Sequence, residues 1–235
     1  MSRWQPKRFW ASATVAAEDG GFAILLDNRR VKTPAKQPLI LPTAGLAALI
    51  ATEWDAQVGP VNPETMPATR MANSAIDKVI PQYDEVAGLL SAYGDTDHIC
   101  YRATKPAALI ARQAAAWDPL LDWAADALNA RLSARSGVMH LPQNRAAVTV
   151  LHQHVVALGN FRLAALHDLV ALSGSLILAF AVGRGRLSPD DAWTSSRIDE
   201  LWQIEEWGLD EDAAKTAALK HQAFHQAARF YALCG

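Results

Sequence analysis

The sequence predicts an α+β protein with a small β-rich N-terminal domain over residues 1–103 and a larger all-helical C-terminal domain over residues 104–235. Two observations predict it: short apolar runs separated by turn residues dominate the first part, and long Ala- and Leu-rich stretches at helical spacing follow residue 104. A third is composition, because 51% hydrophobic and 20% charged residues are typical of a chain that buries a core.

The first strands are indicated by the apolar runs ATVAAE and FAILL, which the turn signal DGG separates as in a β-hairpin. The stretch DNRR then turns into VKTP, and PLILP predicts a further short strand. These segments together predict the sheet of the N-terminal domain.

Helices are predicted between these strands and residue 103. Thr43 can cap a helix over AGLAALIATEWDAQ, which ends before Pro60. The stretches PATRMANSAIDKVI and YDEVAGLLSAY predict two more helices, separated by Pro81. The alternation in DHICYR predicts a last strand.

The C-terminal domain is predicted as a series of helices. The stretch PAALIARQAAAWDPLLDWAADALNARL can kink at Pro119, and RAAVTVLHQHVVAL ends at Gly159, a glycine suited to a helix C-cap. One buried helix is expected over FRLAALHDLVALSGSLILAFAV. Ser188 caps a helix that begins at Pro189 and continues through RIDELWQIEEWG, and EDAAKTAALKHQAFHQAARFYAL closes the chain.

Composition excludes several classes of protein. A formal net charge of -2 argues against a general nucleic-acid binder, and no run of 18 apolar residues predicts a membrane span. The start MSRWQPKRFW lacks the apolar core of a secretory signal. Two cysteines, Cys100 and Cys234, make no disulfide framework. We therefore expect a cytoplasmic protein without membrane insertion or nucleic-acid partners.

The pair His221 and His225 is the first candidate metal site, because residues four apart share one face of a helix. The metalloprotease pattern requires a glutamate directly after the first histidine, and here that residue is Gln222. No third ligand follows before the chain ends. Surface histidines are therefore the favoured interpretation.

A second candidate is GDTDHICY, where Asp95, Asp97, His98 and Cys100 lie close together. Aspartates at turns commonly bond nearby backbone N–H groups, so a local structural role is favoured. His152 and His154 are two apart, and on a helix they point in different directions. No catalytic residues, metal or cofactor are predicted, and a metal-dependent hydrolase built on either candidate is kept as an alternative.

The stretch RIDELWQIEEWGLDED is both apolar and acidic. On a helical wheel starting at Trp193, with roughly 100° per residue, the apolar side chains span more than half the circle. These side chains are Trp207, Ile204, Leu201, Ile198 and Trp202. Glu206, Asp199 and Gln203 form the solvated face.

Glu205 falls inside the apolar arc, where a carboxylate is costly unless it is paired or reaches water. An arginine on another helix would satisfy it internally. A docking surface for another protein would also have one charge set in an apolar face. The wheel leaves both interpretations open.

Five stretches, in order along the chain, resemble the chaperones that assemble the F1 sector of ATP synthase by binding its α subunit. They are LDNRRVKTPAKQPLILP, IATEWDAQ, MPATRMANSAID, TDHICYRA and QIEEWG. The likeness runs from about Phe9 to about Phe230, and Asn28 replaces a usual glycine, which changes only the expected turn type.

The resemblance implies a β-rich domain followed by a helical one and a non-enzymatic function. The chaperone would bind the newly made α subunit and shield its subunit interface until the β subunit joins. It also implies that Glu205 is the important acid of QIEEWG. We expect a free monomer in the bacterial cytoplasm, or the matrix for mitochondrial relatives, and keep a scaffold for another protein as an alternative. The predicted partner-binding residues are Glu205, Gln203, Trp207, Trp202, Leu201 and Ile198.

Overall fold

The computed structural model describes residues 7–235 and divides the chain into two compact units. The strand unit contains the chain up to Tyr83, with Asn160–Ala165 and Arg229–Gly235. The helical unit contains Asp84–Gly159 and Leu166–Ala228. A β-containing first part and a larger helical part were both predicted, and the domain boundary at residue 103 stays a prediction.

The strand unit is built around a β-hairpin. Strands β1 (Ala13–Glu18) and β2 (Gly21–Leu26) are antiparallel, as the DGG turn predicts. The short strands β3 (Arg29–Arg30) and β4 (Ile40–Leu41) both pair with β2, which is therefore the central strand. Gly21 is required at its position, because a Cβ there would lie 2.3 Å from the carbonyl oxygen of Leu41.

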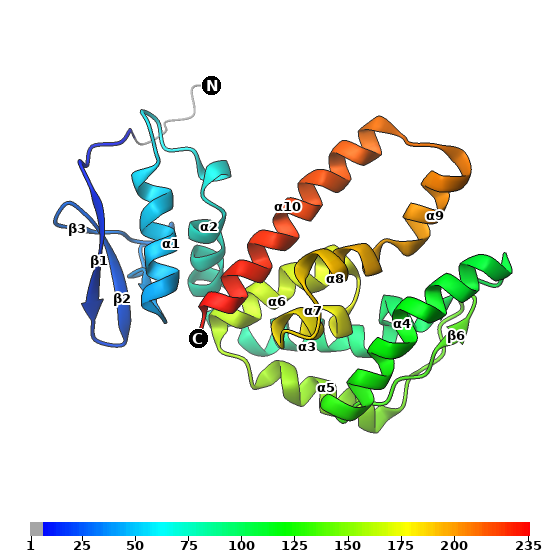
Figure 1. The fold of residues 1–235 in the computed structure, drawn as a ribbon. Helices are drawn as coiled ribbons and strands as arrows, with labels where there is room; N and C mark the ends of the chain where they lie inside the picture. Colours follow the sequence, from blue (N-terminus) through cyan, green and yellow to red (C-terminus); the bar gives the residue numbers. More distant parts are fainter. Residues whose placement is uncertain (1–6) are drawn as a thin grey trace. The chain divides into compact units, whose positions relative to one another are not determined.

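Helix α1 (Ala44–Asp55) packs against β1 and β2 (Figure 1). Thr43 caps it as predicted, since its hydroxyl oxygen accepts a hydrogen bond of 3.2 Å from the Leu46 amide. Leu46 and Ile50 of α1 are buried, and so is Ile24 of β2. A helix on one face of a small sheet gives this unit its core.

The two helices predicted on either side of Pro81 are both present, and the chain between them stays helical. A 3-10 turn (Pro63–Thr65) precedes α2 (Pro67–Ser74). A π-helical turn (Ala75–Val79) and a 3-10 turn (Ile80–Gln82) then join α2 to α3 (Tyr83–Thr96) without an extended residue. Pro81 lies in the first turn of a new helical segment, where a missing N–H costs no hydrogen bond.

The stretch DHICYR is a strand only in part. His98–Cys100 form a 3-10 turn, and β5 (Tyr101–Arg102) pairs in parallel with β6 (Arg135–Ser136) of the helical unit. It therefore does not extend the N-terminal sheet. The two-residue strand β6 is also a small departure from an all-helical second part.

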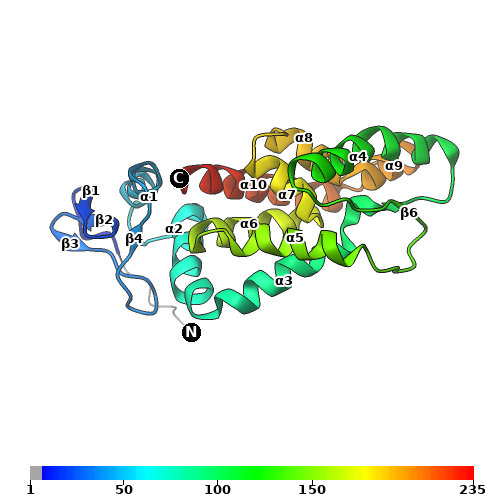
Figure 2. The ribbon, with the colours of Figure 1, turned by 90° about the horizontal axis from the view of Figure 1, so that it is seen from below.

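Seven helices follow in the helical half of the described chain. They are α4 (Ala107–Ala127), α5 (Arg145–Val156), α6 (Asn160–Ser173), α7 (Leu176–Gly183), α8 (Pro189–Ser196), α9 (Ile198–Trp207) and α10 (Glu211–Leu233) (Figures 1 and 2). Pro119 lies inside α4, which continues through it. Every residue of α7 from 176 to 181 is buried, so α7 forms the centre of the core.

Two predicted boundaries in this part are corrected. Gly159 does not cap α5, because it precedes α6 with an ordinary φ of -72°. The single buried helix expected over 161–182 is two helices, α6 and α7. Gly174 adopts a left-handed φ of 71° between them, and the Ser175 hydroxyl caps α7 by accepting from the Leu178 amide. Within residues 7–235, none of the helices has both the length and the apolar character that a membrane crossing requires.

Candidate partner-binding site

The predicted site lies on α9, and α9 is separate from α8. The single helix expected from Ser188 onward is interrupted at Arg197, whose φ of -119° and ψ of 21° are not helical. The Ser196 hydroxyl donates a 2.7 Å hydrogen bond to the Trp193 carbonyl, and the Arg197 guanidinium lies over the Trp193 ring. The helical wheel therefore holds only from Ile198 onward, and Trp193 belongs to another helix.

The predicted residues of α9 differ in exposure. Ile198 is buried, Leu201 and Trp202 are half-buried, and Gln203, Glu205 and Trp207 are exposed. One face of α9 lies along α4 (Figure 2). The contact with α4 explains why the predicted residues near the start of α9 are buried or half-buried.

The predicted solvated face is correct for Gln203 and Glu206, which are both exposed, and wrong for Asp199. Asp199 is half-buried, and its carboxylate accepts a 2.6 Å hydrogen bond from the side-chain amide of Gln113 on α4. A polar contact therefore fixes the first turn of α9 against α4.

Glu205 has an arginine partner on another helix. Nη1 of Arg112, on α4, lies 2.8 and 2.7 Å from the two carboxylate oxygens of Glu205. The Glu205 side chain nevertheless stays 55% exposed, and that of Arg112 36%. An ion pair this open to water contributes about 0–1 kcal/mol to stability. The carboxylate is thus both internally paired and accessible to a partner protein.

Two large apolar side chains are exposed to solvent at the end of α9. Trp207, its last residue, is 80% exposed, and Leu209 in the following turn is 62% exposed. Gly208 between them has a φ of 90°, which favours glycine. Exposed tryptophan is uncommon away from binding surfaces, because its burial is worth more than that of other side chains.

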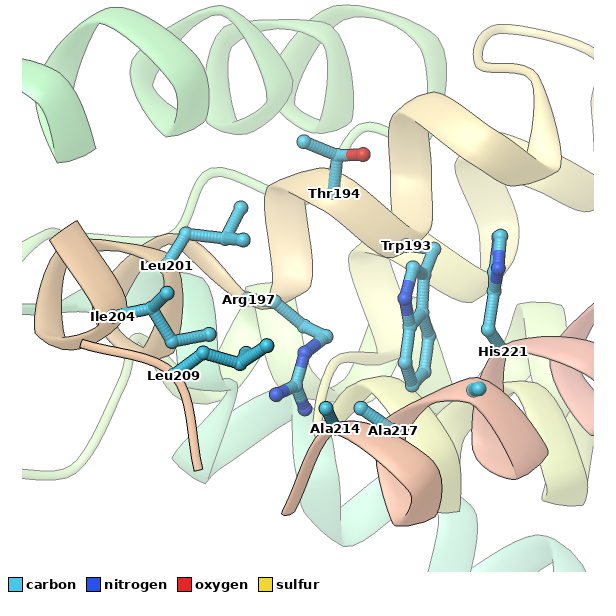
Figure 3. Close-up of a pocket in the computed structure, with 10 residues that line it drawn as sticks. Trp193, Thr194, Arg197, Leu201, Ile204, Leu209, Ala214, Ala217 and His221 are labelled. Atoms are coloured by element: carbon cyan, nitrogen blue, oxygen red, sulfur yellow. The ribbon is translucent and has the colours of Figure 1, made fainter. Parts of the chain in front are cut away.

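A hollow of about 270 Å³ lies between α8, α9 and the start of α10 (Figure 3). Leu201, Ile204 and Leu209 line one side, and Ala214 and Ala217 of α10 line another. The remaining lining residues are Trp193, Thr194, Arg197, Ala218 and His221. Periodicity along α9 indicates only Leu201 and Ile204 among these lining residues. The α10 side of the hollow cannot be predicted in this way, because the chain turns after Gly208 and brings α10 alongside α9.

The second sequence candidate does not form a convergent cluster. Asp97 is fully buried, and its carboxylate accepts from the amides of Ile99 at 3.2 Å and Ile177 at 3.0 Å. Burial raises the pKa of Asp97. Asp95 accepts instead from the Gln143 amide at 2.6 Å, and the ring of His98 lies against Trp117. The local bonding predicted for the aspartates holds only for the Ile99 amide, because the amides of Ile177 and Gln143 lie far away in the sequence.

The other sequence candidates have separate partners. His152 is 2.9 Å from the Ser91 hydroxyl, and His154 is 2.9 Å from the Leu128 carbonyl. Cys100 and Cys234 are free thiols, and burial raises the pKa of each to about 12. A thiol with so high a pKa is a poor nucleophile at neutral pH.

His221 and His225 do share a face of α10, and the sequence argument missed their third neighbour. The third neighbour precedes both histidines in the sequence, on a different helix. The structure brings Asp190, from the first turn of α8, to within 3.1 Å of His221 and 2.9 Å of His225. The hydrogen bond from His225 lowers the pKa of the Asp190 carboxyl most, and that from His221 lowers it further.

An acidic helix that ends in exposed aromatic and aliphatic side chains, beside an apolar hollow, is typical of a protein that binds another protein. The described residues thus present a surface of the kind that protein-binding proteins use.

The chain belongs to the ATP12 chaperone family: the family model described as "ATP12 chaperone protein" matches residues 7–125. The mitochondrial protein atp12 of Schizosaccharomyces pombe is 28% identical over an alignment of 221 residues, and the match covers 88% of this chain and 75% of that protein. These matches confirm the family that the motifs indicate.

Solved structures of the family extend the match across α9. The crystal structure of Atp12 from Paracoccus denitrificans superimposes with a TM-score of 0.95 at 50% identity, over 97% of this chain and 98% of that one. The Atu1473 protein of Agrobacterium tumefaciens gives a TM-score of 0.93 at 41% identity, over 98% and 87% of the two chains. The family and the α+β fold with a larger helical part are therefore established.

Proposed function

We propose that this chain is an ATP synthase assembly chaperone, which binds the newly made α subunit of the F1-ATPase and shields its subunit interface until the β subunit joins. Membership of the ATP12 chaperone family supports the assembly role. The observation that carries the choice of site is Glu205, whose carboxylate on α9 pairs with Arg112 and stays more than half exposed.

The site supplies two kinds of interaction. Trp207, Leu209 and the apolar hollow offer area whose burial contributes about 25 cal/mol per Å², before the cost of association. The charge of Glu205 sets register and partner choice more than affinity. Because its pair with Arg112 is open to water, a basic group of the α subunit can replace Arg112 at little cost.

The same features favour release. An interface of a few exposed side chains on one helix end gives moderate affinity, so the β subunit can displace the chaperone by covering the same surface of α. The proposed function needs no catalysis and no cofactor. We propose further that the free protein is a monomer and acts in the cytoplasm.

Co-purification with the F1 α subunit tests the proposed function. The wild type and two variants, Glu205→Lys and Glu206→Lys, are each co-expressed with α, and circular dichroism checks their folding. Glu206 is the matched control, because it is also exposed on α9, belongs to the solvated face, and undergoes the same change of charge.

We expect α to be recovered with the wild type and with Glu206→Lys, and to be lost with a folded Glu205→Lys. Recovery of α with all three would remove Glu205 from the site. Failure of the wild type to recover α would overturn the proposed partner and favour a scaffold for another protein.

A further inference from the structure

Asp190, His221 and His225 form a cluster in which all three ligand atoms lie close to one another. Oδ1 of Asp190 is 3.1 Å from Nε2 of His221 and 2.9 Å from Nε2 of His225. The two Nε2 atoms are 3.0 Å apart. The histidines are held on one face of α10 by their four-residue spacing, and Asp190 comes from the first turn of α8.

Hydrogen bonds alone cannot account for all three of these short distances. A ring nitrogen of histidine either carries a proton and donates, or lacks one and accepts, but it cannot do both. With two such nitrogens and one carboxylate oxygen, at most two of the three close pairs can be hydrogen bonds. The third pair then brings two N–H groups or two lone pairs together at about the same distance. A single cation in contact with all three atoms removes this conflict.

The distances fit a metal ion. Two ligands at right angles on an ion, with bonds of about 2.1 Å, lie about 3.0 Å apart. The observed 2.9, 3.0 and 3.1 Å therefore match three ligands on one face of an octahedron. Two imidazoles with one carboxylate are a ligand set for divalent ions of the first transition row, including Zn²⁺, rather than for Mg²⁺ or Ca²⁺.

The cluster is also accessible and its ligands are held in place. The Asp190 side chain is 70% exposed and those of the two histidines 38%, so an ion can enter without unfolding. The His221 ring stacks on Trp193 at 5.4 Å and 22°, and Trp193 is itself buried against Phe224. Such support fixes the ring orientation, as metal ligands require.

We propose that Asp190, His221 and His225 bind one divalent transition-metal ion, with its remaining coordination positions open to solvent. The bound ion joins the first turn of α8 to α10. Because Trp193 and His221 also line the apolar hollow, the ion fixes one end of that hollow.

Metal titration tests the proposal. The tag-free full-length protein is stripped with a chelator, dialysed, and titrated with Zn²⁺ and separately with Ni²⁺ in a calorimeter. The variants are His221→Ala, His225→Ala and Asp190→Ala. His167→Ala is the matched control, because His167 lies 3.0 Å from the carboxylate of Asp168, to which it is adjacent in sequence, and thus resembles one arm of the cluster.

We expect one ion per chain in the wild type and in His167→Ala. Each cluster variant should bind at least ~100-fold more weakly, since loss of even an outer hydrogen-bond partner weakens metal sites by roughly 10- to 100-fold. Asp190 is so exposed that its replacement should leave the circular dichroism spectrum unchanged, which keeps the test valid if a histidine variant unfolds. The proposal would be overturned if the wild type bound neither Zn²⁺ nor Ni²⁺ stoichiometrically. It would also be overturned if Asp190→Ala bound the ion with unchanged affinity.

Discussion

Glu205 combines an internal ion pair with a carboxylate that stays exposed to water. The sequence places its charge within an apolar arc, and the structure gives it Arg112 as a partner 93 residues earlier in the chain. Spacing along a helix reveals an unusual charge but carries no information about a side chain on a distant helix. Whether Glu205 acts through Arg112 or through direct contact with the α subunit is decided by exchanging the two charges.

The exchange variant combines Glu205→Arg with Arg112→Glu. It restores an ion pair between α4 and α9, so the free energy of unfolding should stay within about 1 kcal/mol of the wild type. Binding of α should still be lost, because the carboxylate no longer stands on α9. Thermal unfolding and co-purification with α measure the two effects. An exchange variant that binds α like the wild type would show that only the internal pair matters.

Asp97 gives a second prediction for a single residue. Its two oxygens accept from different backbone amides, those of Ile99 and Ile177. In Asp97→Asn one of these amides would face an NH₂ group, and a buried donor without a partner costs about 1–3 kcal/mol. Removal of a buried carboxylate offsets part of this cost, since burial already raises the pKa of Asp97.

We therefore expect Asp97→Asn to lower the free energy of unfolding by about 1–3 kcal/mol in urea denaturation. Its binding of α should not change when both proteins are folded. Equal or greater stability in the variant would mean that the desolvation of the carboxylate outweighs its hydrogen bonds.

At the scale of elements, the end of α9 carries two exposed large apolar side chains, Trp207 and Leu209. Trp207→Ala should change the free energy of unfolding by less than about 0.5 kcal/mol, because an 80% exposed side chain loses little packing. The same variant should bind α more weakly. Trp193→Ala is the contrasting variant: its ring is buried against Phe224, and its loss should cost about 3–5 kcal/mol.

Urea denaturation and a binding titration with α separate the two tryptophans. If Trp207→Ala binds α as tightly as the wild type does, the end of α9 lies outside the interface.

The elements that the sequence predicts well are those whose signals are local. The DGG turn defines the first hairpin, and Thr43 and Ser188 cap the helices that follow them, each by accepting from an amide three residues on. Such signals involve residues within one turn of each other, so no knowledge of the tertiary structure is needed.

One of the two missed breaks involves a residue far away in the sequence. The amide of Ile177 at the start of α7 donates to Asp97, and the apolar run from 176 to 181 shows no sign of that contact. At the other break the contact is local, because the Arg197 guanidinium lies over the ring of Trp193 in the preceding helix. In the candidate site, Leu201 and Ile204 follow from periodicity, whereas Arg112 and the α10 side of the hollow do not.

For the whole molecule, the helical unit alone contains α9, the Arg112 partner and the apolar hollow. We therefore expect this unit to carry the proposed recognition of α. The proposed shielding further requires that the chaperone and the β subunit compete for the same surface of α. A competition experiment tests that requirement without assuming which residue makes each contact.

The most direct test is transfer of α from the chaperone to the β subunit, followed by size-exclusion chromatography. The complex of this chain with α is isolated, purified β is added, and the fractions are assayed for all three proteins. We predict that α moves into fractions with β while the chaperone elutes free. A stable assembly of all three proteins, or α that stays with the chaperone when β is in excess, would contradict the proposed function.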